Sequence, residues 1–127
     1  MNKEKVVFSF FMVLALTLNF GFYVGEVANP AHHNVYELFA VVTVNLIATI
    51  LKFGDRSQMG AMLLATGLVA LVQLISASLV WTFATQINGT GLTPDVMSTI
   101  VALSGGAMVA NIISVVLLMI ETAMMRH

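Results

Sequence analysis

The sequence predicts an all-α membrane protein with one domain, residues 1–127, built from four transmembrane helices. Hydrophobic residues make up 59% of the chain and charged residues 9%, whereas soluble domains carry about 25% charged residues. A helix needs roughly 20 apolar residues to cross a bilayer. Short polar stretches divide the chain into four segments of about this length, at residues 6–24, 35–53, 59–83 and 96–122.

The first segment follows Lys3 and Lys5, as the core of a signal peptide would. Its apolar run is longer than the roughly 7–15 residues of such a core, and no small-residue cleavage site follows it. We therefore expect a retained span. The second segment begins at a capping box, in which Asn34 is the N-cap and Glu37 stands three residues later.

Helix-capping residues also precede the third and fourth segments. Either Asp55 or Ser57 can cap the third, and Thr93 with Pro94 and Asp95 gives the fourth an N-cap, an N1 proline and an acidic first turn. Both segments exceed the required length, so they are expected to tilt or to project beyond the hydrocarbon.

All five basic residues lie on one side of this four-span arrangement. They are Lys3, Lys5, Lys52, Arg56 and Arg126. The two opposite loops, residues 25–34 and 84–95, contain neither Lys nor Arg. Because cytoplasmic loops carry the excess of basic residues, both termini are predicted to lie in the cytoplasm.

Each segment carries one side-chain amide, and several serines lie at helical spacing from these amides. This membrane-core polar set comprises Asn19, Asn45, Gln73, Ser76, Ser104, Asn111 and Ser114. Asn45, Gln73 and Asn111 are expected near the bilayer midplane and Asn19 nearer the outer face. In the third segment the polar face is predicted to run through Thr66, Val69, Gln73, Ser76 and Val80.

Two roles are open for the polar set. The side chains can bond neighbouring helices together, each worth on the order of 0.6–2 kcal/mol, or they can line a path for an ion or small polar solute. Bonding between helices is favoured because no acidic or basic residue accompanies the amides at mid-depth. Gly105 and Gly106 permit either close helix approach or a break in the fourth helix, and close packing is again favoured.

Two clusters of chemically active side chains are predicted outside the spans. Glu26, His32, His33 and Glu37 form a candidate cation site at the outer surface, although they lack tetrahedral ligand spacing. The inner surface carries a charged rim of Lys5, Lys52, Asp55, Arg56 and Glu121. Glu121 lies near a helix C-terminus, where the dipole disfavours it, so an ion pair with Lys5, Lys52 or Arg56 is expected. No metal site is assigned, and no cofactor is predicted.

An internal similarity relates the second and fourth segments. Residues 44–51 and 110–117 share the asparagine and several aliphatic positions, and both lie on helices that run from the outer to the inner side. This similarity would make the two helical hairpins parallel repeats.

The stretch from His32 to Gln58, including residues 44–51, resembles a family of uncharacterised small four-span proteins of the bacterial inner membrane. That resemblance implies a multi-pass protein of the inner (cytoplasmic) membrane and no known activity. The tripeptide at residues 43–45 is also similar to the asparagine-bearing second helix of small fluoride channels. The chain lacks their glycine-rich Arg-Tyr motif and their polar break in the third helix, so only the general idea of a small oligomeric pore is retained.

Composition and residue types exclude several classes of function. A net charge of −1 leaves no basic surface for nucleic acid, and the absence of cysteine excludes thiol chemistry. The spans hold no nucleophile–base pair, so an enzyme is not expected. The favoured function is transport-related: a homo-oligomeric ion or small-solute pathway, or a subunit of an ion-transport complex. The alternative is a non-conducting accessory or scaffold subunit of a membrane complex.

Overall fold

The computed structural model describes residues 3–28, 35–54, 57–87, 89 and 93–124. This part of the chain is all-α with four long helices, as predicted. The helices are α1 (Lys3–Ala28), α2 (Val35–Lys52), α3 (Gln58–Thr82) and α4 (Pro94–Met124), and a short π-helix, η1 (Phe83–Ile87), continues α3.

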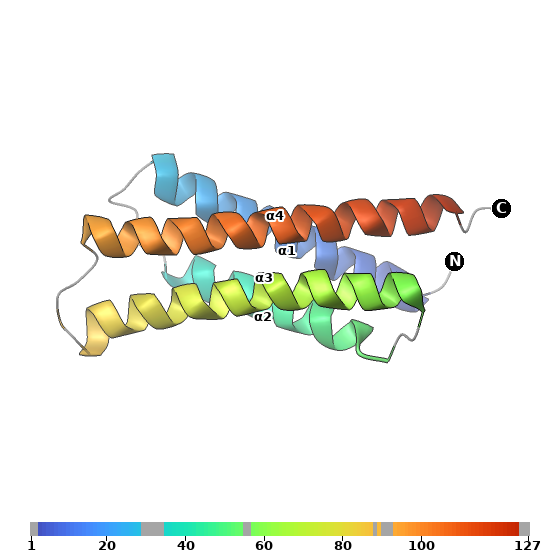
Figure 1. Cartoon of the computed structure of the whole chain (residues 1–127), viewed down its shortest axis with the longest axis horizontal. Helices are drawn as coiled ribbons and strands as arrows, with labels where there is room; N and C mark the ends of the chain where they lie inside the picture. The colour runs from blue at the N-terminus through green and yellow to red at the C-terminus, as the bar shows by residue number, and fades with distance from the viewer. Residues whose placement is uncertain (1–2, 29–34, 55–56, 88, 90–92, 125–127) are drawn as a thin grey trace.

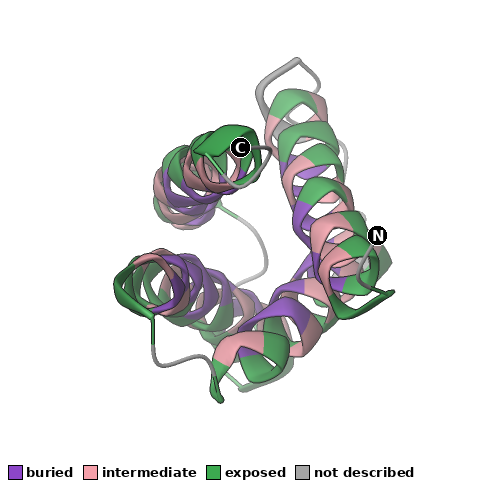
Figure 2. Cartoon of the chain, turned by 90° about the vertical axis from the view of Figure 1, so that its right-hand side faces the viewer, coloured by how far each residue is buried: buried purple, intermediate pink, exposed green. Residues whose placement is uncertain are grey.

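Consecutive helices run antiparallel to one another (Figure 1), and the four form a ring when the bundle is viewed from its end (Figure 2). α1 contacts α2 and α4, and α3 contacts the same two helices from the other side. The start of α1 and the end of α4 lie at the same end of the bundle. Buried residues face the inside of the ring and exposed residues face outward (Figure 2), as in an antiparallel four-helix bundle.

Capping side chains set the starts of two helices. The Ser57 hydroxyl accepts a hydrogen bond from the Gly60 amide at 2.9 Å, so Ser57 caps α3. Thr93 precedes α4, and its hydroxyl accepts from the Val96 amide at 3.3 Å. The predicted cap of α2, Asn34, lies outside the described residues.

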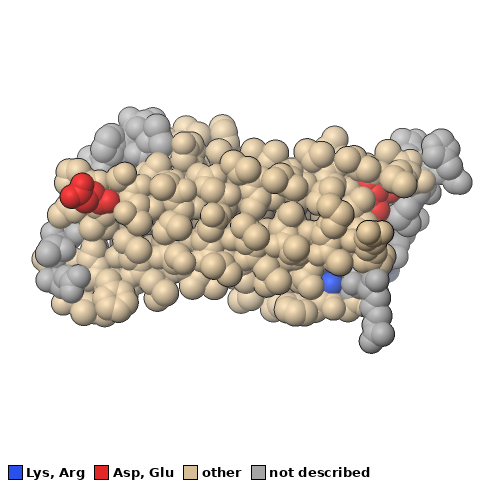
Figure 3. All heavy atoms as spheres, viewed as in Figure 1, with Lys and Arg blue, Asp and Glu red and all other residues tan. Residues whose placement is uncertain are grey.

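Three helices are long and apolar enough to cross a membrane: residues 3–25, 58–87 and 94–124. α2 has 18 residues, which at 1.5 Å per residue give about 27 Å, slightly less than the ~30 Å of the hydrocarbon core. The protein is therefore a multi-pass membrane protein by these three spans, while the crossing by α2 stays a prediction. On the face shown in Figure 3, the described charged side chains lie at the two ends of the bundle, and an uncharged band separates them.

Two apolar clusters fill the ring. The larger contains Phe22, Leu38, Leu74 and Ile100 and the smaller Phe8, Met12, Leu63 and Leu118. Along every helix, polar residues fall between the two clusters, and we call them the polar layer. The polar layer consists of Asn19, Asn45, Thr66, Asn111 and Ser114.

Candidate functional site

The polar layer is centred on Asn19 of α1, whose side chain is fully buried. Its amide nitrogen donates to the Ser104 carbonyl at 3.0 Å. Its amide oxygen accepts from the Met108 backbone N–H at 2.9 Å and from the Asn111 side-chain nitrogen at 3.0 Å. This orientation of the amide is assigned because it satisfies both atoms. Three hydrogen bonds thus join α1 to α4.

Two of the bonds of Asn19 go to backbone groups within α4. In an α-helix each N–H pairs with the carbonyl four residues earlier, so the Met108 N–H and the Ser104 carbonyl are regular partners of one another. The Asn19 amide bridges this pair, donating to one member and accepting from the other. Asn19 therefore fixes the position of α4 against α1.

Two glycines bring neighbouring helices close to α4 beside this bridge. A Cβ built at Gly105 would lie 2.8 Å from Cε1 of Tyr23, and one at Gly106 would lie 2.7 Å from Nε2 of Gln73. The Tyr23 ring and the Gln73 amide thus occupy space that a side chain would fill. α4 is a continuous helix from Pro94 to Met124, so the glycines serve close packing and no helix break is present.

α3 is joined to α4 through hydroxyl groups. The Thr66 and Ser114 hydroxyl oxygens lie 2.5 Å apart. Thr66 also lies 3.1 Å from the carbonyl oxygens of Met62 and Leu63. When Thr66 donates to one of these carbonyls, Ser114 donates to Thr66, which leaves both hydroxyl protons bonded.

α2 contributes to the polar layer differently. Asn45 is buried, but its nitrogen donates to the Val41 carbonyl of its own helix at 3.0 Å. The Thr49 hydroxyl likewise donates to the Asn45 carbonyl at 2.8 Å. A Cβ at Gly67 of α3 would lie 3.1 Å from that hydroxyl oxygen. α2 therefore meets α3 through close packing at a glycine, and the Asn45 nitrogen bonds within α2.

The predicted polar faces agree with the structure on α4 and differ on α3. Ser104, Asn111 and Ser114 are all fully buried. On α3 the predicted face lies at the edge of the buried surface: Val69 is 51% exposed and Ser76 donates to the Val72 carbonyl of its own helix. The buried row of α3 instead runs through Leu63, Gly67, Ala70, Leu74, Ala77 and Trp81. Its small residues allow closer helix approach than the polar ones, which explains the difference.

The predicted depth of Asn19 also differs. Its direct bond to Asn111 puts the two amides at the same height in the bundle, whereas the sequence placed Asn19 nearer the outer face. Two buried acceptors near this height, Asn111 Oδ1 and Gln73 Oε1, have no hydrogen-bond partner among the described residues. An unpaired buried acceptor costs on the order of 1–3 kcal/mol, so these two oxygens mark the least satisfied part of the interior.

The inner charged rim is partly assembled. Lys5 Nζ lies 2.8 Å from Glu121 Oε1, with side-chain exposures of 25% and 14%, so Lys5 is the partner that Glu121 needs. Lys52 Nζ lies 4.4 Å from the centroid of the Phe8 ring, a cation–π contact between α2 and α1. The other two rim residues, Asp55 and Arg56, lie outside the described residues.

The outer candidate cation site is described only at Glu37, which is partly buried near the start of α2. His32, His33 and the side chain of Glu26 lie outside the described part of the chain. Within the described part, no group of three or more His, Cys, Asp or Glu residues is placed to hold a metal ion. The outer cation site therefore stays a prediction.

The sequence did not reveal the contacts of Asn19 with backbone groups, or the ring of Tyr23 on Gly105. The adjacent Gly105 and Gly106 were the available signal, because two glycines within a long apolar helix expose the backbone to neighbouring side chains. Which side chains approach them depends on the helix order around the ring.

Comparison with known proteins identifies the family of the chain. No curated protein and no solved structure matches the chain. The family described as a family of unknown function (DUF6394) matches residues 32–122. The match spans α2, α3 and most of α4, and includes Asn45, Gln73 and Asn111. By this match, the chain belongs to the DUF6394 family.

Proposed function

We propose that this membrane protein is a non-conducting subunit that assembles with other membrane chains and supports them structurally. The observation that carries the proposal is that the fully buried amide of Asn19 makes three hydrogen bonds to α4. Asn19 and Asn111, and likewise Thr66 and Ser114, could line a path through the bundle, but their bonds join its helices instead. Partner chains would then dock on the lipid-facing side of the bundle. A groove of about 440 Å³ lies there between α1 and α4, and its lining includes Val13, Leu118 and Met119.

The proposed role is not enzymatic. General acid–base and nucleophilic catalysis need a titratable or activated group within reach of a substrate. The polar layer contains only amides and hydroxyls. Thr66 of α3 bonds to Ser114 of α4, and the Asn45 nitrogen bonds within α2. These groups are suited to holding helices together.

A second candidate is an ion or small-solute pathway formed by several copies or by a larger complex. The buried acceptors Asn111 Oδ1 and Gln73 Oε1 favour it, because carbonyl oxygens can replace the hydration shell of a cation. Four helices leave at most a thin central space, so such a pathway would require other chains.

Flux measurements separate the two candidates. The purified protein in liposomes is expected to pass monovalent and divalent ions no faster than empty vesicles do. In particles extracted from native membranes with an amphipathic polymer, the mass is expected to exceed that of a single chain of 13.7 kDa. Flux that Asn111→Leu reduces without changing the assembly would favour the pathway, and single-chain particles would contradict both candidates.

We also propose that both termini face the cytoplasm of a bacterial cell and that the protein lies in its inner membrane. The described lysines, Lys3, Lys5 and Lys52, lie at the end of the bundle where α1 begins. In the sequence, Arg56 stands between α2 and α3 and Arg126 follows α4, and cytoplasmic loops carry the excess of basic residues.

The chain has no cysteine, so single cysteines can report the topology. In spheroplasts, Asp95→Cys is expected to react with a membrane-impermeant maleimide, and Lys3→Cys is expected to react only after the membrane is opened. Both residues are exposed in the structure. The reverse pattern would overturn the predicted orientation.

A further inference from the structure

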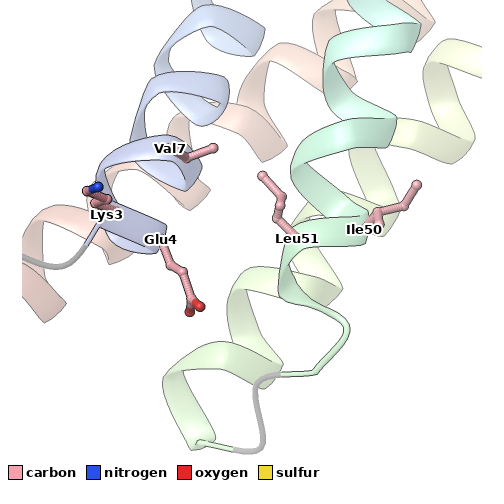
Figure 4. A pocket seen from close by; sticks show the side chains of 5 residues that line it. All are labelled: Lys3, Glu4, Val7, Ile50 and Leu51. Carbon is pink, nitrogen blue, oxygen red and sulfur yellow. The ribbon is translucent and has the colours of Figure 1, made fainter.

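A surface groove lies between the start of α1 and the end of α2, with a volume of about 500 Å³. Its lining consists of Lys3, Glu4, Val7, Ile50 and Leu51. Figure 4 shows Val7 and Leu51 pointing toward one another across the groove from the two helices. The volume falls within the range of about 300–1,000 Å³ that is typical of small-molecule sites.

The groove combines apolar walls with two opposite charges. Val7, Ile50 and Leu51 are 44%, 57% and 45% exposed, so they face the surroundings of the bundle. Lys3 and Glu4 are the first two residues of α1 and precede Val7. They lie where a membrane-spanning helix leaves the hydrocarbon. An apolar wall below a cation and an anion is complementary to an amphipathic molecule whose polar end carries both charges.

The other lysines at this end have different neighbours. Lys5 pairs with Glu121 of α4, and Lys52 lies over the ring of Phe8. Lys3 is the lysine that lines the groove, together with Glu4. The charge pattern at the groove is therefore balanced.

We propose that this groove binds a phospholipid whose headgroup carries a phosphate and a primary ammonium, the chemistry of phosphatidylethanolamine. Lys3 takes the phosphate, Glu4 accepts hydrogen bonds from the ammonium, and one acyl chain lies along Val7, Ile50 and Leu51. An ionised carboxylate has about four acceptor positions, so Glu4 can serve the ammonium alongside other neighbours. A headgroup with a phosphate alone leaves Glu4 facing negative charge, and a quaternary ammonium has no N–H to donate.

Native mass spectrometry of the protein in detergent tests the proposal with three lipids of identical acyl chains: phosphatidylethanolamine, phosphatidylcholine and phosphatidylglycerol. Phosphatidylethanolamine is expected to bind about two- to five-fold more tightly than either of the others, the range that exposed ion pairs supply. Glu4→Gln is expected to remove the advantage of phosphatidylethanolamine over phosphatidylcholine. Lys3→Gln is expected to weaken the binding of both of these lipids. Asp95→Asn, which removes an exposed acid at the other end of the bundle, is the matched control and is expected to change nothing.

A bulky substitution tests the place of binding separately from the headgroup. Val7→Trp is expected to fill the groove and to lower the affinity for all three lipids, while the thermal midpoint stays unchanged because position 7 faces outward. Equal binding of phosphatidylethanolamine and phosphatidylcholine, a preference for phosphatidylglycerol, or an unchanged preference in Glu4→Gln would overturn the proposal. None of these results depends on whether the protein conducts ions or assembles with partners.

Discussion

Asn19→Leu is expected to lower the free energy of unfolding by about 2–3 kcal/mol. The substitution removes three hydrogen bonds between α1 and α4. It also strands the Asn111 amide, whose nitrogen loses its acceptor while its oxygen already has no partner among the described residues. Unfolding by titration with sodium dodecyl sulfate in mixed micelles would measure the change.

A neighbouring residue on the same helix provides the control. Thr17 is exposed, and its hydroxyl donates to the Leu14 carbonyl of α1 at 3.0 Å. Thr17→Val is expected to change the stability by no more than about 0.5 kcal/mol. Equal losses for Asn19→Leu and Thr17→Val would contradict the role given to Asn19.

A double substitution separates the bond between the two amides from their other effects. When Asn19 and Asn111 both become Leu, neither amide of this pair is left without the other. The combined loss is therefore expected to be smaller than the sum of the two single losses by about 0.5–3 kcal/mol, as for residues in one hydrogen-bond network. Strict additivity would mean that the two amides do not interact.

Gly105→Ala is expected to lower the free energy of unfolding by about 1–3 kcal/mol, the usual cost of inserting atoms into a packed interior. The new Cβ would lie 2.8 Å from Cε1 of Tyr23. The ring would have to move away from α4, at the height where Asn19 bonds to the same helix. Adding Tyr23→Leu, which replaces the ring by a smaller side chain, to the Gly105→Ala variant is expected to recover part of the lost free energy of unfolding.

Two other glycines make matched controls for this substitution. At Gly21 of α1 no atom lies within 4 Å of a built Cβ, so Gly21→Ala is expected to be neutral or to stabilise by up to about 1 kcal/mol through helix propensity. At Gly106 the contact is the end of the flexible Gln73 side chain, which can turn aside at small cost. If Gly105→Ala and Gly21→Ala had the same effect, the close contact at Gly105 would be refuted.

The sequence predicts the helices well because their signals are local. The caps at Ser57 and Thr93 and the buried face of α4 follow from residue type and helical spacing. The choice of Lys5 as the partner of Glu121 is not local, because Lys52 was equally available in the sequence and lies instead over Phe8.

The parts that the sequence misplaces depend on contacts between helices. On α3, small residues such as Gly67 and Ala70 lie in the interior, and the predicted polar face, including Val69, is displaced to its edge. The depth of Asn19 depends on how far α1 and α4 slide past one another, and periodicity within one helix contains no information about that shift. Partners such as the backbone of Met108 could not be predicted either, since every residue of a helix carries the same backbone groups.

If the protein has the non-conducting structural role proposed above, its polar layer is closed to water and holds the helices together. Labelling at Ser114 tests it most directly, because this residue is fully buried, bonds to Thr66 of α3, and differs from cysteine in one atom. In native membranes Ser114→Cys is expected to resist a small water-soluble thiosulfonate on both sides of the membrane and to react once the protein is unfolded, whereas the exposed Asp95→Cys reacts throughout. Modification of Ser114→Cys in the folded protein at a rate comparable to that of Asp95→Cys would show a water-filled interior and contradict the proposed structural role.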